Sequence, residues 1–163
     1  MITSASANTP LPVWDSYRRP SHLAEPKNDP MRHISASVSP ILLHSTRQAL
    51  NRLAELTEDW DGYGSSAPIP GAVPNAYSSL DNIYAQILES LFPWKQPYVS
   101  SNENGEVVFE WWSGQRKLTL YIGERRLEYI KVWGPSITTQ MADGVLTLGE
   151  FYTLWNWLHN PSQ

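Results

Sequence analysis

Residues 106–122 read EVVFEWWSGQRKLTLYI, and this stretch decides the predicted fold. Apolar side chains recur at every second position on both sides of residues 113–116, where Ser-Gly-Gln-Arg is typical of a turn. Successive side chains of a β-strand point to opposite faces of the sheet, so a period of two places these apolar residues on one face. They are Val107, Phe109, Trp111, Leu118, Leu120 and Ile122. We therefore predict a β-hairpin with strands at residues 106–112 and 117–122.

Further strands extend the sheet on both sides of this hairpin. Residues 123–125 form a second turn, which leads into a predicted strand over residues 126–133. Gly-Pro at residues 134–135 ends that strand, and a fourth strand is expected over residues 137–141. A short strand over residues 98–100 would precede the hairpin. Consecutive antiparallel strands form a meander, so we expect a sheet of four or five strands.

Helical periodicity precedes the sheet. Ser39 is a suitable N-cap with Pro40 at the first helical position, and Leu43, Leu50 and Leu53 follow near helical spacing. A second apolar stripe predicts another helix between residues 70 and 93. Its members are Ala76, Leu80, Ile83, Tyr84, Ile87, Leu88 and Leu91.

A third helix follows the sheet. Thr147 and Glu150 have the spacing of a capping box, and an apolar stripe with helical spacing comes directly after them. The stripe consists of Phe151, Leu154, Trp155 and Leu158. We therefore predict an α+β fold with two N-terminal helices, an antiparallel four- to five-stranded meander and a closing C-terminal helix, the helices packed on one sheet face.

The composition indicates one globular domain. We expect residues 1–38, rich in Pro and Ser, to form a flexible arm, and residues 39–163 to form a single α+β domain. The absence of cysteine excludes disulfides and thiolate metal sites. No apolar run approaches the length of a membrane span, and the net charge is -4 without a block of like charge. We expect a soluble cytoplasmic protein that does not bind membranes.

The most distinctive motif is Trp60-Asp61-Gly62-Tyr63-Gly64. Asp61 can form an Asx turn, the two glycines favour positive φ, and Trp60 and Tyr63 could anchor the turn in the core. The ligand spacing of an EF-hand loop is missing, because no glutamate stands at the twelfth position of such a loop. We therefore interpret residues 60–64 as a structural turn and expect no metal.

The same motif carries a resemblance. Together with the pattern Leu-Ala-Glu-Leu at residues 53–56 and strand-like segments at residues 105–111 and 117–122, it resembles a group of small bacterial and phage proteins of uncharacterised function. These share a Trp-Asp-Gly-Tyr/Glu-Gly-Ala-like turn, and Ser65 stands where they tend to have alanine. The resemblance covers residues 50–133 and implies a shared fold and a phage or mobile-element origin, with no known activity.

Candidate catalytic groups are few. Glu106 and Glu110 share a predicted strand face, with Glu128 alongside, and paired carboxylates can perform acid/base chemistry. Cross-strand ion pairing explains them as well. The available basic partners are Arg116, Lys117 and Arg126. His159 ends the third helix, where the helix dipole would favour an imidazolium. No nucleophile, phosphate-loop or metal spacing is present, so we assign no catalytic residue, metal or cofactor.

Aromatic residues suggest a surface for binding another protein. Adjacent strand residues point to opposite faces, so Trp111 and Trp112 cannot both be buried on one face. The predicted partner-binding residues are Trp112, Tyr121, Arg116, Lys117 and Trp157, with Trp112 and Tyr121 expected close together across the hairpin. Residues 105–163 carry five Lys and Arg against six Asp and Glu, so nucleic acid is not the expected partner.

From these observations we expect a non-enzymatic protein–protein interaction module. The resemblance implies its sharpest form, a phage or mobile-element encoded inhibitor or accessory of a bacterial defence complex, similar to an anti-CRISPR protein. One alternative is a small hydrolase or toxin-like enzyme that uses the carboxylates of Glu106, Glu110 and Asp61. The other is an antitoxin-like or homodimerising module whose aromatic face pairs with itself.

Overall fold

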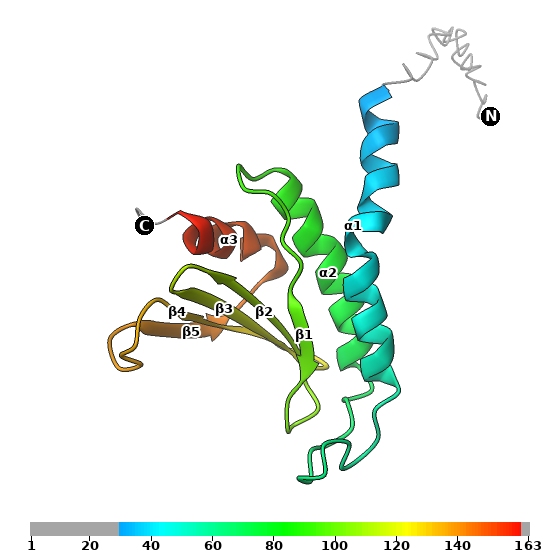
Figure 1. The fold of residues 1–163 in the computed structure, drawn as a ribbon, viewed down its shortest axis with the longest axis vertical. Helices are drawn as coiled ribbons and strands as arrows, with labels where there is room; N and C mark the ends of the chain where they lie inside the picture. Colours follow the sequence, from blue (N-terminus) through cyan, green and yellow to red (C-terminus); the bar gives the residue numbers. More distant parts are fainter. Residues whose placement is uncertain (1–29, 161–163) are drawn as a thin grey trace, which may run out of the picture.

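The computed structural model describes residues 30–160 of the protein, as three α-helices, a 3₁₀-helix and five strands (Figure 1). The elements are α1 (Pro30–Ala54), α2 (Ala72–Leu88), β1 (Tyr98–Ser101), β2 (Val107–Ser113), β3 (Arg116–Ile122), β4 (Leu127–Val132), β5 (Met141–Val145), η1 (Leu148–Glu150) and α3 (Phe151–His159). The predicted α+β class is confirmed. No helix in this part of the chain combines the length and the apolar character that crossing a bilayer requires.

The five strands form one antiparallel meander in the order β1-β2-β3-β4-β5. The predicted hairpin is β2–β3, in which Trp111 faces Leu118 and Phe109 faces Leu120. The last strand was predicted wrongly, because β5 begins where the predicted strand at residues 137–141 ends. Residues 133–140 form a closed turn instead: Gln140 N–H donates to Ser136 C=O at 2.7 Å, and Trp133 N–H donates to Gln140 C=O at 3.0 Å.

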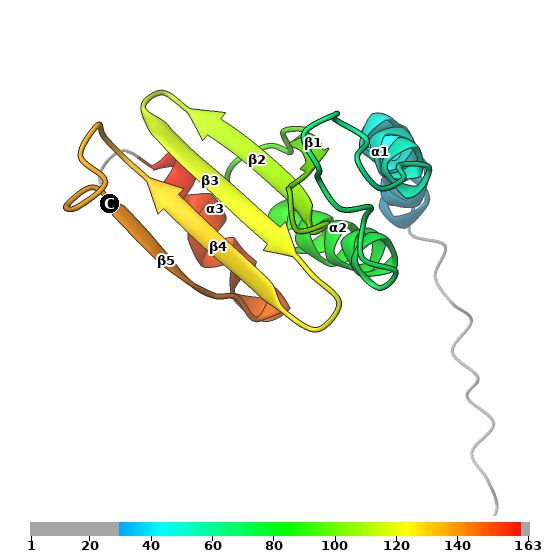
Figure 2. The same cartoon turned by 90° about the horizontal axis from the view of Figure 1, so that it is seen from below.

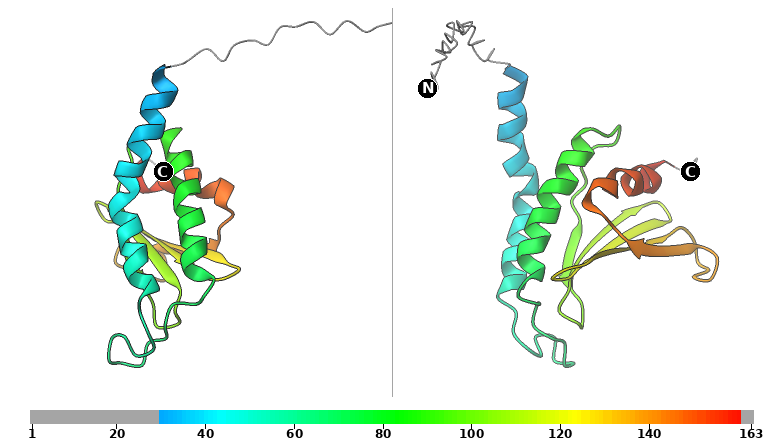
Figure 3. Two further views of the ribbon diagram at one scale, coloured as in Figure 1. Left: turned by 90° about the vertical axis from the view of Figure 1, so that its right-hand side faces the viewer. Right: turned by 180° about the vertical axis from the view of Figure 1, so that it is seen from behind.

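The helices form a second layer on one side of the sheet. Helices α2 and α3 pack on β2 and β3, while α1 packs against α2 and beside β1 (Figures 1 and 3). Figure 2 looks onto the opposite side of the sheet, which no helix covers within the described residues. Between the layers lie fully buried side chains from α1, α2, β2, β3 and α3. They include Leu50, Leu80, Ile83, Phe109, Leu120, Phe151 and Trp155.

Helix α1 begins earlier than predicted. It starts at Pro30, where a missing N–H costs no intrahelical bond, and continues through Pro40, which was expected at the first helical position. The predicted boundary between arm and domain therefore falls inside α1. Residues 1–29 of the predicted arm lie outside the described residues.

Helix α2 ends earlier than predicted. Leu88 is its last residue, and both Leu88 and Leu91 are exposed, so the buried stripe stops at Ile87. In α3 the prediction is confirmed, since all four residues of the predicted stripe are buried. The Glu150 carboxylate accepts the backbone N–H of Thr147 at 3.4 Å, as expected of the capping box.

Candidate functional site

We call the side of the sheet opposite α2 and α3 the outer face. Strand register determines its members, because residues paired across neighbouring strands share a face. Its exposed or half-buried apolar side chains are Tyr98, Trp112, Tyr121, Ile130, Val132, Met141 and Val145. Its polar and charged members are Ser100, Glu110, Lys117, Thr119, Glu128 and Asp143. The outer face is thus a mixed apolar and acidic surface.

The two adjacent tryptophans of β2 lie on opposite sides of the sheet, as predicted. Trp111 is 2% exposed and its indole N–H donates to Lys95 C=O at 2.8 Å, whereas Trp112 is 50% exposed. Trp111 packs edge-on against Trp155 of α3, with ring centres 6.0 Å apart. Trp111 therefore belongs to the core and Trp112 to the outer face.

The expected closeness of Trp112 and Tyr121 is wrong. The turn between β2 and β3 pairs Trp112 with Lys117, and Tyr121 lies opposite Val108, four residues along the strand. Four strand residues span about 13 Å, so the two rings occupy different ends of the outer face. Lys117 lies between a ring and a carboxylate: its ammonium is 5.2 Å from the Trp112 ring centre and also forms an ion pair with Glu110.

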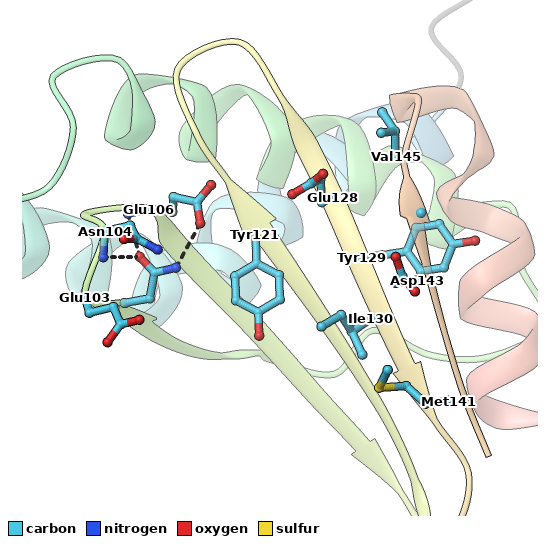
Figure 4. A pocket seen from close by; sticks show the side chains of 12 residues that line it. Glu103, Asn104, Glu106, Tyr121, Glu128, Tyr129, Ile130, Met141, Asp143 and Val145 are labelled. Carbon is cyan, nitrogen blue, oxygen red and sulfur yellow. Dashed lines mark hydrogen bonds between the residues drawn. The ribbon is translucent and has the colours of Figure 1, made fainter. Parts of the chain in front are cut away.

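A shallow hollow of about 730 Å³ lies on the outer face beside Tyr121 and extends along β5 to Met141 (Figure 4). Its apolar lining consists of Tyr121, Ile130, Met141 and Val145. Four carboxylates surround this lining: Glu103, Glu106, Glu128 and Asp143. The hollow reaches from the β1–β2 loop across β3 and β4 to β5.

Two of the five predicted partner-binding residues lie elsewhere. Arg116 is adjacent to Lys117 in β3, so its side chain points to the helical side of the sheet, where it donates to the carbonyls of Trp157 and Asn160. The guanidinium also lies 5.3 Å from the Trp157 ring centre. Trp157 packs edge-on against Trp133, with ring centres 6.2 Å apart. The arrangement ties the C-terminus of α3 to the sheet.

The motif at residues 60–64 is a compact turn. Gly62 and Gly64 have φ of 75° and 85°, as their position predicted, and Asp61 accepts the backbone N–H of Tyr63 at 2.9 Å. The Ser65 hydroxyl, which donates to Asp61 at 2.6 Å, and the Tyr63 N–H hold the pKa of Asp61 below its ordinary value. The expected anchoring in the core is wrong, because the Trp60 and Tyr63 side chains are exposed.

The candidate carboxylates are engaged separately. Glu110 pairs with Lys117, Glu106 accepts the Asn102 side-chain amide at 2.8 Å, and Asp61 is bonded within its own turn. Glu128 forms an ion pair with Arg126 at 2.8 Å, two residues away in the same segment and not across strands as expected. Across the part of the chain that the structure describes, no three His, Cys, Asp or Glu side chains are arranged to hold a metal ion.

His159 differs from its predicted state. Its ring lies 4.2 Å from the Trp155 ring centre and 5.4 Å from that of Phe92, and its Nδ1 lies 3.1 Å from Trp155 C=O. Burial among these rings, with the charge of Lys95 as a smaller cause, lowers the pKa of His159. The expectation of a stabilised imidazolium is therefore wrong, because the loss of water outweighs the hydrogen bond to Trp155 C=O, which by itself would raise the pKa.

The sequence interpretation missed the contribution of β5. Met141, Asp143 and Val145 line the hollow, yet the predicted strand stopped at residue 141. A signal was present, since these residues alternate with the small residues Ala142 and Gly144 in a period of two.

The comparisons with known proteins match nothing: no protein-family model, no curated protein and no solved structure is similar to this chain. The resemblance of the turn at residues 60–64 to a group of small phage and bacterial proteins stays a hypothesis. The geometry of the outer face is therefore the basis of the functional argument.

Proposed function

We propose that this protein is a non-enzymatic module that binds another protein through the outer face of its sheet. One observation carries the proposal: the helices lie on one side of the sheet, and the other side presents the half-exposed Trp112 and the hollow. An antiparallel sheet with one solvated face normally alternates apolar and polar residues, whereas this face carries large apolar side chains on all strands.

The chemistry of the exposed side chains supports binding to protein. Tryptophan and tyrosine dominate the energetics of protein interfaces, because they bury large areas at a small cost in side-chain entropy. The Lys117 ammonium above the Trp112 ring is already balanced by Glu110, which leaves the outer face without a cluster of positive charge. A surface of this kind attracts a phosphate backbone weakly.

The finer proposal concerns the biological setting. The resemblance of the turn at residues 60–64 supports a phage or mobile-element origin and a role as inhibitor or accessory of a bacterial defence complex. A homodimer through the outer face is the competing proposal. We do not favour a carboxylate enzyme, because the carboxylates of Glu110 and Asp61 are engaged by separate neighbours.

Partner capture with matched variants tests the proposed function. Tagged wild-type protein would be used to isolate partners from the source cells, and the identified partner would then be purified and its Kd measured. We expect Trp112→Ala to weaken binding by about 2 kcal/mol, roughly thirtyfold, as for an interface hot spot. Tyr63→Ala removes an even more exposed aromatic outside the sheet, at 93% against 50% for Trp112, and should leave Kd unchanged.

Other results would redirect the proposal. Equal affinity of Trp112→Ala and wild type contradicts docking on the outer face. A dimer in sedimentation equilibrium that Trp112→Ala dissociates favours the homodimer. Loss of single-stranded nucleic acid binding, with a steep dependence on salt, favours a stacking surface for bases.

A further inference from the structure

The sheet has a free edge at β5 within the described residues. β5 is the last strand in the sheet order and pairs with β4 alone. Two hydrogen bonds that flank the strand show which residues of β5 bond to β4. Trp133 N–H donates to Gln140 C=O at 3.0 Å, and Leu146 N–H donates to Leu127 C=O at 2.8 Å. Hydrogen-bonded residues alternate along an antiparallel pair, so the even-numbered residues of β5 bond to β4.

The odd-numbered residues of β5 consequently direct their backbone away from the sheet. These are Met141, Asp143 and Val145, and each presents an N–H and a C=O at the free edge. Their side chains are also the ones that line the hollow (Figure 4). A strand added at this edge would therefore form hydrogen bonds beside the hollow and place every second side chain on the outer face.

The charged side chains that line the hollow beside this edge are all acidic. The residues that line the hollow include four carboxylates and neither Lys nor Arg. Glu128 has an ion pair with the exposed Arg126, but among the described residues no ion pair compensates Glu103, Glu106 or Asp143. Neighbouring strands lie about 4.8 Å apart, so a basic side chain on an added strand would lie next to Asp143 and could extend toward Glu128.

We propose that β5 accepts an extended segment of the partner protein as a sixth strand, with Lys or Arg at the positions that face the hollow. The proposal rests on the proposed function, for which it names the partner's chemistry and its mode of binding. Edge pairing supplies affinity through main-chain hydrogen bonds, and alternate side chains supply specificity. A second copy of this chain fits less well, because two β5 edges would bring two acidic hollows together.

Amide hydrogen exchange measured by NMR provides the direct test. In the free protein the amides of Asp143 and Val145 should exchange rapidly, while those of Ala142 and Gly144 are protected by β4. The probe is a synthetic peptide in which Lys and Val alternate, and its matched control replaces every Lys with Glu. We expect the Lys-Val peptide to slow exchange at Asp143 and Val145 at least tenfold and the Glu-Val peptide to leave it unchanged.

Variants of Val145 separate edge pairing from side-chain contact. Val145→Pro removes an outward N–H without breaking a bond to β4, and the side chain is 65% exposed, so folding should be retained. We expect it to raise Kd for the Lys-Val peptide at least tenfold. Val145→Thr keeps the N–H and should stay within about twofold of wild type. Asp143→Lys should weaken the Lys-Val peptide and strengthen the Glu-Val peptide.

Several results would overturn the inference. They are equal binding of the two peptides, binding without protection at Asp143 and Val145, and normal binding by Val145→Pro. Protection of these amides that grows with protein concentration would assign the edge to a second copy. If the peptides fail while a captured partner still depends on Trp112, this inference is wrong and the proposed function stands. If the Lys-Val peptide binds at β5 and partner capture is insensitive to Trp112→Ala, the inference about β5 stands and the proposed role of Trp112 is wrong.

Discussion

The Lys117 ammonium lies 5.2 Å from the centre of the Trp112 ring, and the two residues face each other across the β2–β3 pair. This contact holds a half-exposed tryptophan in place on the outer face, one residue away from the fully buried Trp111. Substitutions at these two consecutive residues therefore test different properties, core packing at Trp111 and surface contact at Trp112.

We expect truncation of these tryptophans to have different effects on stability. Trp111→Ala leaves a cavity between β2 and α3 and should lower the free energy of unfolding by about 3–5 kcal/mol. Trp112→Ala loses one cation–π contact on the surface and should cost about 1 kcal/mol or less. Urea unfolding followed by tryptophan fluorescence and circular dichroism measures both. A larger loss for Trp112→Ala would contradict the assignment of the two faces.

Two glycines with positive φ provide a second prediction. Gly62 and Gly105 both have φ of 75°, so Ala at either site has the unfavourable left-handed backbone, which costs about 1–2 kcal/mol. A Cβ at Gly62 meets nothing within 4 Å, whereas a Cβ at Gly105 would lie 2.3 Å from Ala67 C=O. We therefore expect Gly105→Ala to be clearly more destabilising than Gly62→Ala in thermal unfolding. Equal melting temperatures for the two variants would contradict this expectation, because they would show that the segments around Ala67 and Gly105 separate without cost.

The third prediction is that Arg116 contributes to the stability of the fold and not to partner binding. Its guanidinium donates to two carbonyls at the C-terminus of α3 and lies over the Trp157 ring. We expect Arg116→Ala to lower stability by about 1–3 kcal/mol while leaving the affinity for a captured partner unchanged. Arg125→Ala, at an exposed arginine of the β3–β4 turn, is the control and should alter neither. Loss of affinity with unchanged stability would restore Arg116 to the binding surface.

The stability of the protein should depend on pH through His159. Burial lowers its pKa in the folded state below 6.5, so the unfolded state binds a proton that the folded state resists. Stability should therefore be highest above about pH 7 and fall as the pH drops through 6.5, with the loss complete below the depressed folded pKa. The measurement is the midpoint of urea unfolding as a function of pH, from above about pH 7 to below the folded pKa of His159.

Matched variants assign this pH dependence. His159→Phe keeps an aromatic ring against Trp155 and should reduce the dependence around pH 6.5. His44→Gln changes an exposed histidine of α1 and should preserve it. An unchanged slope in His159→Phe would mean that another group titrates in this range.

Much of the fold follows from local sequence. A period of two predicted β2 and β3, the opposite orientations of Trp111 and Trp112 followed from it, and Thr147 with Glu150 predicted the start of the closing helical segment. These predictions succeed because backbone geometry alone determines where successive side chains point and which N–H groups a helix start leaves unpaired. The positive φ of Gly62 and Gly64 was predictable for the same reason.

Tertiary structure decided the features on which the site depends. Trp157 and Arg116 read as surface residues in the sequence, but they contact each other because α3 ends above the start of β3. The hollow exists because the β1–β2 loop, β4 and β5 meet on one face, although β5 is far from the loop in sequence. Such contacts arise from the packing of distant segments, which local periodicity does not encode. The sequence by itself therefore determined most of the elements and the faces of the central hairpin. Only the tertiary packing decided which side chains gather at the hollow and which are covered by the end of α3, because those contacts join segments that are distant in the chain.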